Sequence, residues 1–480
     1  MLARGPDPAG RPPPSPLELL HPDGPPRRIS VCGSGAAAAL APANATQEGV
    51  ADVAVLALCR AERRDRVWVS RAAGVAALVA EDGLVVAPRP SRGLRAELAT
   101  LGFTPEIRLL HIPDVERSRY LVPLRRMATD YALRRLIPLD PLKRTAARAL
   151  RVPGIDRLGP TSVVFRRPGA RPLLEWLWTV RTPRAACTAI VTRSWRPNGA
   201  TVVHRFGDRG IPDAIAKVGG GAGREAAALR SVGPTADGTA VAVPTLLEER
   251  ILGNLPVAIQ TPIPGLPASR ALRGSPDRAR NILRRLATWL MEWNSATVAR
   301  RRFEAPDAER QLLAPARRLT PLLEGGDAYL ERLTRLCDRF RGGKVPFVAA
   351  HNDLTASNVL LAEGERLGVV DWEEAEPLCL PLGDLAYAVA DFAAAVDGYR
   401  DRPAAFAACF ERSGSFAHLT GELLRDAAGS LGLDAQLLEL SLQACWLHHA
   451  DNERREASTR DLPDRPFLAI LKRAAVWHAA

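Results

Sequence analysis

Three polar side chains stand between two apolar runs in the segment AAHNDLTASNVLL, residues 349–361. Asp353 follows His351 by two residues, Asn358 follows Asp353 by five, and Asp371 comes after the next apolar stretch. Carboxylate and amide oxygens suit a hard cation such as Mg²⁺, which proteins usually hold with one or two oxygens while substrate phosphates and water complete the shell. A remaining carboxylate can accept a proton or orient a hydroxyl group. Together these residue types indicate phosphoryl transfer, in which the protein mainly positions groups and neutralises charge.

A hairpin is the local element that would gather these side chains. The apolar runs VLL and LGVV are predicted strands on either side of the turn AEGE. Asn358 lies directly before the first strand and Asp371 directly after the second, so both fall at the same end of the hairpin. Asp353 lies one loop earlier, at the same rim. The plainer alternative is that these three residues only form turns at hairpin ends.

The spacing H-x-D-x-x-x-x-N, with an aspartate thirteen residues after the asparagine, resembles the catalytic loop and metal site of the protein-kinase-like fold. Together with GVVDWEEAEPLCLPLGDLAY, the segment looks like the aminoglycoside phosphotransferase and choline kinase branch. The resemblance implies that Asp353 is the catalytic base or orients the hydroxyl, and that Asn358 and Asp371 bind the metal ions. It further implies that His351 braces the loop and that Asp384 anchors the helix that follows.

Some acidic and amide residues in this segment allow other interpretations. Asn352 departs from the branch, which usually has glycine there, and this raises the question of backbone strain. Asp384 could instead cap the N-terminus of its helix. Glu373, Glu374 and Glu376 could form an acidic rim for a cationic acceptor, although a solvated acidic loop is the simpler interpretation.

The protein-kinase-like fold that the sequence resembles also requires a cationic side chain that contacts the nucleotide phosphates. This side chain should lie on the third strand of an N-terminal sheet, and a glutamate in a helix should hold it in place. The segment DAIAKVGGGAGREAAALRSV places Lys217 in an apolar strand and Glu225 eight residues later in a predicted helix. A compact ammonium reaches phosphate as a point charge, where a planar guanidinium substitutes poorly. The resemblance implies that Lys217 contacts phosphates and that Glu225 orients it. The alternatives are a solvated strand-edge lysine and a surface glutamate paired with Arg224 or Arg230.

The strand PVAIQT, which leads into PIPGLP, resembles the hinge between the two lobes. There the backbone near Gln260 and Thr261 would meet the purine. Pro262 has no N–H group, so its neighbours must make these contacts. No G-x-G-x-x-G loop precedes Lys217, which argues against a protein kinase more than against a small-molecule kinase. The resemblance covers about residues 170–480, roughly two-thirds of the chain.

Composition and periodicity divide the chain into four parts. Residues 1–28 are a Pro-rich leader that is predicted to be disordered. Residues 29–150 alternate short strands with helices, which predicts a degenerate Rossmann-like or methyltransferase-like α/β domain with a mainly parallel sheet. Residues 151–265 are predicted as an N-lobe of five mostly antiparallel strands and one helix, and residues 266–480 as a mainly helical C-lobe. The expected fold class is an α/β domain plus an α+β protein-kinase-like two-lobed domain.

The N-terminal region has a motif of its own. The stretch SVCGSGAAAA contains Gly33-x-Gly35-x-x-Ala38, a turn of the dinucleotide-binding type. The acidic residue about twenty positions later, Asp52, begins a strand instead of ending one. Residues 83–114 look like the latter half of a class I methyltransferase domain in texture only. A degenerate or regulatory domain is the favoured interpretation, and an active methyltransferase is the alternative.

Composition restricts the partners and the compartment. The net charge of +12 could suggest nucleic acid, but the basic residues are nearly all arginine and occur along the whole chain, aromatic residues make up only 5%, and no nucleic-acid-binding motif is present. We therefore expect no nucleic-acid partner. No long apolar run predicts a membrane span, and the N-terminus lacks the apolar core of a signal peptide. The seven scattered cysteines are typical of reduced thiols in a cytoplasmic protein.

The expected function is transfer of the γ-phosphoryl group of ATP, or of GTP, to a hydroxyl of a sugar, an aminoglycoside or an amino alcohol, with Mg²⁺ as cofactor. Two alternatives stay open: a catalytically inactive kinase-like binding or scaffold protein, and a methyltransferase-like protein with an attached kinase-like module. The sequence leaves open the acceptor, the choice between ATP and GTP, a ligand of the N-terminal domain, the oligomeric state and turnover itself.

Overall fold

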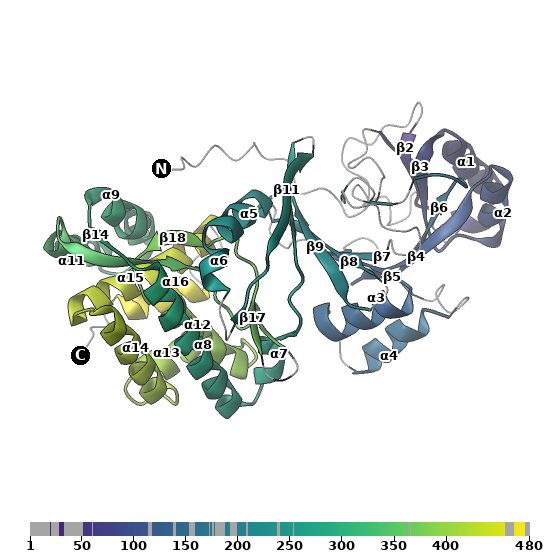
Figure 1. Cartoon of the computed structure of the whole chain (residues 1–480). Coiled ribbons are helices and arrows are strands. Elements are labelled where there is room, and N and C mark those ends of the chain that lie inside the picture. The colour runs from purple at the N-terminus through teal and green to yellow at the C-terminus, as the bar shows by residue number, and fades with distance from the viewer. Residues whose placement is uncertain are drawn as a thin grey trace. The chain divides into compact units, whose positions relative to one another are not determined.

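The structure of the chain is a computed structural model (Figure 1). It describes residues 20, 28–32, 51–59, 61–113, 118–137, 141–152, 159–171, 173–174, 177, 188–192, 199–207, 210–237, 241–252, 254–362, 364, 366–456 and 465–475. Most of the predicted leader lies outside the described residues, and so does the turn at Gly33, Gly35 and Ala38. The predicted dinucleotide-binding turn therefore stays a prediction.

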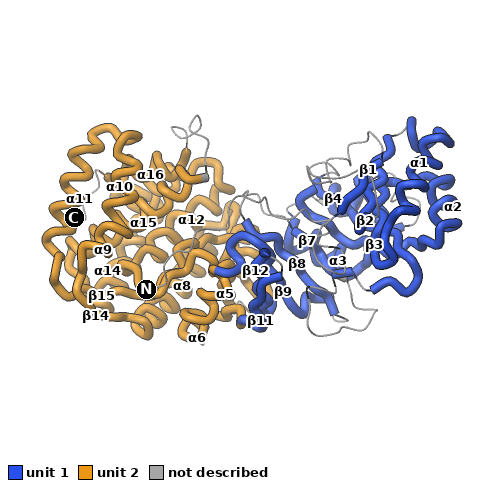
Figure 2. Tube along the Cα trace, turned by 90° about the horizontal axis from the view of Figure 1, so that it is seen from above, with its two compact units in different colours: residues 1–223, 246–262 blue, residues 224–245, 263–480 orange. Residues whose placement is uncertain are grey.

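The chain divides into two compact units, which Figure 2 colours separately. Unit 1 comprises Met1–Gly223 and Leu246–Pro262, and unit 2 comprises Arg224–Thr245 and Ile263–Ala480. The four parts predicted from the sequence stay a prediction about independently folding domains.

Unit 1 is built on one large sheet whose described part has eleven strands. The strands are β1 (Ile29–Cys32), β2 (Ala51–Leu56), β3 (Val79–Pro88), β4 (Thr104–Ile112), β5 (Tyr120–Pro123), β6 (Thr161–Arg166), β7 (Thr188–Thr192), β8 (Thr201–Phe206), β9 (Pro212–Val218), β11 (Leu246–Leu252) and β12 (Leu255–Gln260). Their order across the sheet is β1-β2-β3-β6-β4-β5-β7-β8-β9-β12-β11. The sheet therefore runs through residue 150, where the sequence predicts a boundary.

The direction of the strands differs from part of the expectation. β1, β2 and β3 are parallel, as predicted for an α/β layer, but β6 pairs antiparallel with both β3 and β4, and β4 pairs antiparallel with β5. The expectation of a mainly parallel sheet is wrong beyond β3, because β6, which lies in the region predicted as the N-lobe, inserts between β3 and β4. The five strands expected for the N-lobe, β7, β8, β9, β12 and β11, are antiparallel neighbours, as predicted.

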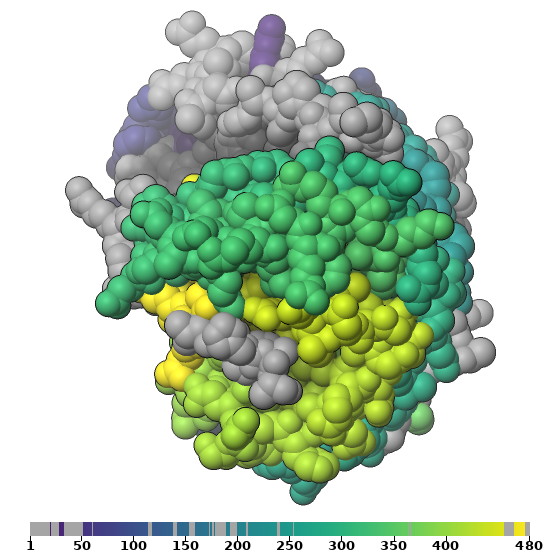
Figure 3. All heavy atoms as spheres, turned by 90° about the vertical axis from the view of Figure 1, so that its left-hand side faces the viewer, coloured from purple at the N-terminus to yellow at the C-terminus, as the bar shows by residue number. Residues whose placement is uncertain are grey.

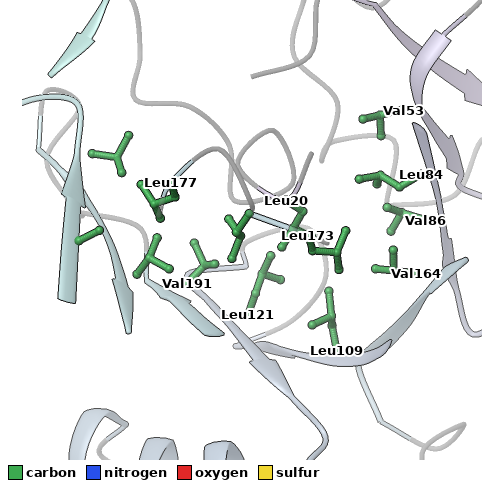
Figure 4. Close-up of a cluster of buried hydrophobic side chains, with 14 of the residues drawn as sticks. Leu20, Val53, Leu84, Val86, Leu109, Leu121, Val164, Leu173, Leu177 and Val191 are labelled. Atoms are coloured by element: carbon green, nitrogen blue, oxygen red, sulfur yellow. The ribbon is translucent and has the colours of Figure 1, made fainter. Parts of the chain in front are cut away.

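The two halves of this sheet are joined by the pairing of β5 with β7, in which Leu121 lies opposite Val191. Both side chains belong to one buried apolar cluster that reaches from Val53 to Val203 and Val257 (Figure 4). Figure 4 shows Leu20, Leu173 and Leu177 on the same side of the sheet as Leu121 and Val191. Because all of these side chains leave water together, the N-terminal region and the five-stranded region share one apolar core.

Helices cover the other apolar surfaces of unit 1. Alternate residues of β2 and β3 point to the opposite face, where they pack against α1 (Arg66–Ala77) and α2 (Arg92–Thr100). A third buried cluster lies between the middle strands, α3 (Arg126–Tyr131) and α4 (Pro141–Ala149).

Unit 2 is mainly helical. Its helices in the described part are α6 (Gly233–Ala236), α7 (Ala268–Leu272), α8 (Pro276–Thr297), α9 (Ala305–Ala308), α10 (Ala314–Leu319), α11 (Gly326–Phe340), α12 (Gly383–Val396), α13 (Arg402–Phe410), α14 (Ala417–Leu431), α15 (Ala435–Glu456) and α16 (Pro466–Ala474), and α5 (Ala222–Ser231) begins at the unit boundary. α10 and α11, in green in Figure 3, pack against α15, in yellow. None of the helices described is long and apolar enough to cross a lipid bilayer.

Two small sheets complete unit 2. β10 (Val241–Ala242), β17 (Leu367–Val369), β16 (Val359–Leu361) and β13 (Leu266–Pro267) form one, in that order. β14 (Ala299–Arg302), β15 (Lys344–Ala350) and β18 (Glu376–Cys379) form the other. The loop between β15 and β16, residues 351–358, carries the polar side chains singled out in the sequence, and we call it the 351–358 loop.

Candidate active site

The predicted hairpin is present. β16 and β17 pair antiparallel, with Val359 opposite Val369. One residue further out, the N–H of Val370 donates to the carbonyl oxygen of Asn358 at 3.0 Å. Asn358 directly precedes β16, and Asp371 is the second residue after β17. Because the two strands are antiparallel, both residues lie at the same end of the hairpin.

Asp353 and Asn358 are in direct contact. The side-chain Nδ2 of Asn358 donates to the backbone carbonyl of Asp353 at 2.8 Å and to its side-chain Oδ2 at 3.0 Å. The turn between them is held by its own backbone, since the N–H of Asn358 donates to the carbonyl oxygen of Thr355 at 3.0 Å. The spacing of five residues therefore brings the carboxylate and the amide together.

We call the hairpin end that bears Asp353, Asn358 and Asp371 the rim, and His351 connects its two sides. Its Nδ1 accepts from the N–H of Asp353 at 3.3 Å, and its Nε2 lies 3.1 Å from the carbonyl oxygen of Val370, the residue before Asp371. These partners require the neutral ring with the proton on Nε2. The ring is fully buried and meets Trp372 edge-on at 4.7 Å between centroids. Trp372 in turn meets Trp293 of α8 at 5.4 Å, so the rim rests on a column of aromatic rings.

Two residues at the rim have left-handed backbones. φ is 61° at Asn352 and 71° at Asp371. Asn and Asp are the residues other than glycine that adopt this conformation most readily. The side-chain Nδ2 of Asn352 also donates to the carbonyl oxygen of Glu374 at 3.0 Å, which fixes it in place. The departure from glycine at Asn352 is therefore accommodated by a residue type that tolerates the same backbone.

Asp384 holds the start of the 351–358 loop. It lies in the first turn of α12 and is buried, and its two oxygens accept from the N–H groups of His351 at 2.7 Å and Asn352 at 2.8 Å. Burial raises the pKa of its carboxyl to about 6, although the two N–H groups lower it. The N-cap of α12 is Leu382, so the contacts of Asp384 go to the loop and not to a helix end.

The acidic residues after Trp372 are engaged with arginines. Glu374 lies 3.0 Å from Arg224, and Glu376 pairs with Arg310. Their charges are therefore compensated within unit 2, which does not favour the interpretation of an open acidic rim for a cationic acceptor.

The residues expected on the nucleotide side lie mostly in unit 1. Lys217 is buried in β9, between Val202 of β8 and Ala258 of β12. Gln260 is buried at the end of β12, and Thr261 follows it half-buried. Glu225 is fully buried in α5, in the part of that helix that belongs to unit 2. Their joint action with the 351–358 loop stays a prediction.

Sequence reasoning missed one buried carboxylate of this region, Asp391, which also binds the backbone of the 351–358 loop. Its sequence signal is an aspartate in the middle of GDLAYAVADFAAAV, a helix that is otherwise almost entirely apolar after Asp384. A charge in such a segment needs a partner.

Comparison with known proteins shows what this region is similar to. Residues 220–454 match the model of the phosphotransferase enzyme family, APH. No curated protein matches the chain. Among similar solved structures is aminoglycoside phosphotransferase APH(3'')-Id from Streptomyces rimosus, with 17% identity and a TM-score of 0.31; the match covers 52% of this chain and 89% of that chain. A thermostable mutant of aminoglycoside phosphotransferase APH(4)-Ia has 12% identity and a TM-score of 0.39, and the match covers 60% of this chain and 94% of that chain. An aminoglycoside phosphotransferase from Alicyclobacillus acidocaldarius has 13% identity and a TM-score of 0.33, and the match covers 62% of this chain and 94% of that chain.

The matched segment contains every candidate residue described above for unit 2: the 351–358 loop, Asp371, Asp384 and Glu225. Of the residues expected on the nucleotide side in unit 1, Gln260 and Thr261 lie within the matched segment, whereas Lys217 precedes it. The match of residues 220–454 to the phosphotransferase enzyme family agrees with the family expected from the residues.

Proposed function

We propose that the chain is a small-molecule kinase that transfers the γ-phosphoryl group of ATP or GTP to a hydroxyl group. The observation that carries this proposal is the contact of Asp353 with Asn358, 3.0 Å between Oδ2 and Nδ2, at the hairpin end that also bears Asp371. Two carboxylates and one amide at a single rim, in a segment of the phosphotransferase enzyme family, support a site for a metal–nucleotide complex and an acceptor hydroxyl.

The donor set at this rim fits Mg²⁺. The described residues hold no group of three or more His, Cys, Asp or Glu side chains that could bind a metal ion. Mg²⁺ needs no such cage, because phosphates and water supply most of its ligands. Asn358 turns its Nδ2 toward Asp353, which leaves its Oδ1 for a cation, and Asp371 would supply a carboxylate. Bound there, Mg²⁺ would neutralise charge on the transferring phosphates.

Asp353 is proposed to orient the acceptor hydroxyl and to take its proton. Transfer then needs only that the hydroxyl oxygen, the γ-phosphorus and the leaving oxygen lie in line, which is a task of positioning. The restraint by Asn358 serves this task, since it sets the direction of the Asp353 carboxylate.

Lys217, Glu225, Gln260 and Thr261 are proposed to serve the nucleotide, Lys217 at its phosphates and Gln260 and Thr261 at its base. The side-chain Oε1 of Gln260 supports this assignment, because it is buried and has no hydrogen-bond partner among the described residues. A buried amide oxygen without a donor costs free energy, and a donor group of a bound nucleotide would satisfy it.

The test is to incubate the chain with γ-labelled ATP, or in parallel γ-labelled GTP, and an extract of small metabolites, with and without Mg²⁺. Label should move to a small molecule only with Mg²⁺, and the Asp353→Asn variant should fail to move it. The acceptor is then read from the labelled product, whether sugar, aminoglycoside or amino alcohol. Nucleotide binding without any transfer would contradict the proposal and favour a scaffold protein.

A further inference from the structure

Helix α12 buries two carboxylates among apolar residues. Asp384 is 7% exposed and Asp391 is 1% exposed, while their neighbours along the helix are almost all alanine, leucine, valine or phenylalanine. The two aspartates are seven residues apart, which is close to two helical turns, so they lie on the same face. A buried carboxylate is costly unless it is paired and hydrogen-bonded, so this face must be occupied by donors.

The donors come from the two ends of the 351–358 loop. Asp384 accepts from the N–H groups of His351 and Asn352, at its start. The Oδ2 of Asp391 accepts from the N–H of Ala356, near its end, at 2.8 Å. Asp353 lies between these two anchors. Ala356 is also held from its other side, because its carbonyl oxygen accepts from the N–H of Ser269 in α7 at 2.9 Å.

A second set of contacts fixes Asp391 itself. The Nη1 of Arg402, at the start of α13, lies 2.7 Å from Oδ1, and the hydroxyl of Tyr399 donates to Oδ2 at 3.1 Å. The guanidinium of Arg402 stacks over the ring of Tyr399 at 4.7 Å and over that of Phe467, in α16, at 5.2 Å. Both oxygens of Asp391 therefore have defined partners, and aromatic rings cover the arginine that compensates its charge.

We infer that Asp391, oriented by Arg402, is a positioning residue for the phosphoryl transfer proposed above. Asp384 fixes the start of the loop, and the hairpin fixes its end at Asn358, whose carbonyl oxygen accepts from the N–H of Val370. Asp391 adds a hold between these two points, at the N–H of Ala356, and so restrains the stretch that carries Asp353. The inference rests on the proposed function for its kinetic consequence, whereas the anchoring of Ala356 can be measured without it.

A comparison of two variants of the full chain separates anchoring from simple compensation of charge. Arg402→Met removes the cation and leaves Asp391 as an acceptor for the Ala356 N–H. Asp391→Leu combined with Arg402→Met removes both charges and also the acceptor. Replacing a buried ion pair by apolar residues is often close to neutral for stability, so the double variant is expected to fold. Asp397→Leu, at the exposed end of the same helix, is the matched control.

Two readouts apply to each variant: hydrogen exchange of the Ala356 amide, and the steady-state kinetics of Mg·ATP hydrolysis with water as the acceptor. The double variant should exchange the Ala356 amide faster than Arg402→Met, and its kcat should be lower by on the order of 10², the usual cost of a displaced reacting group, at unchanged KM for ATP. The control should match the wild-type chain in both. Equal protection of Ala356 and equal kcat in the two variants would overturn the inference.

Two further outcomes are a double variant that does not fold and a wild-type chain without activity. If the double variant does not fold, Asp391→Asn replaces it, because a single amide oxygen cannot serve both Ala356 and Arg402; unchanged Ala356 protection and kcat in that variant would again overturn the inference. If the wild-type chain hydrolyses no ATP and labels no acceptor, the proposed function is wrong, and the exchange of Ala356 alone then decides whether Asp391 anchors the loop.

Discussion

Asn358 restrains Asp353 through one nitrogen, which donates both to the backbone carbonyl of Asp353 at 2.8 Å and to its Oδ2 at 3.0 Å. This donor to the carboxylate is a neutral amide. A neutral donor fixes the direction of the carboxylate without cancelling its charge, and an ionised carboxylate is what proton acceptance requires.

Replacing Asp353 by Asn should abolish most turnover and leave nucleotide binding intact. An amide of the same shape cannot take the hydroxyl proton, and losing a general base usually costs on the order of 10²–10⁴ in kcat. Steady-state kinetics on the labelled acceptor measure the loss, and calorimetric titration with ATP and Mg²⁺ measures the binding. Near-normal turnover of Asp353→Asn would show that another group accepts the proton.

Removing the oxygens assigned to the metal should raise the requirement for Mg²⁺. In Asp371→Asn and in Asn358→Ala, the Mg²⁺ concentration for half-maximal rate should rise at least about tenfold, since even partners outside the first ligand shell are commonly worth that much. Mg²⁺ titrations at saturating ATP give this value. Glu309→Gln, whose carboxylate pairs with Arg317 on the surface, is a suitable control and should leave the titration unchanged. An unaltered Mg²⁺ dependence in both variants would remove these residues from the metal site.

The pH dependence of kcat should show the ionisation of Asp384. Burial raises the pKa of its carboxyl to about 6, and above that pH both oxygens accept N–H groups of the loop. As pH falls through about 6, one oxygen gains a proton and loses its N–H, so kcat should fall. The contribution of this group to folding runs the other way: it is fully present below the ordinary aspartate pKa and is lost as pH rises through about 6.

The Asp384→Asn variant identifies the group responsible. Its kcat should be lower at neutral pH and should lack the fall near pH 6, because an amide does not titrate there. Rates from about pH 5 to about pH 8 for both proteins make the comparison. An acid limb of the same midpoint in Asp384→Asn would assign the titration to another residue.

The shared core of unit 1 predicts that its two halves unfold together. Leu121 is 1% exposed and lies opposite Val191 at the junction of β5 and β7, so Leu121→Ala should cost about 2–5 kcal/mol in the free energy of unfolding. Leu142→Ala, at a leucine that is 84% exposed, should cost little. Urea unfolding followed by far-UV circular dichroism measures both. A chain lacking residues 1–150 that stays folded and monomeric would contradict the shared core.

Local spacing was sufficient to predict that the polar residues at the centre of the candidate site lie together. His351, Asp353, Asn358 and Asp371 lie within one loop and one hairpin, and antiparallel pairing brings residues at fixed sequence distances together without help from the rest of the chain. The five antiparallel strands around Lys217 also follow from short alternating runs between turns. The family match to residues 220–454 agrees with this reading of the loop.

Only the tertiary structure decided the remaining relationships. β6 inserts between β3 and β4, β5 pairs with β7, and Asp391 joins Ala356 to Arg402. In each case the packing of distant segments brings the partners together. The entropy of loop closure depends only weakly on loop length, so the apolar pattern of the sequence is compatible with many pairings of distant segments. The residue types capable of chemistry could therefore be recognised in the sequence. The groups that fix their positions, such as Asp391 and Arg402, could be recognised only in the packed structure.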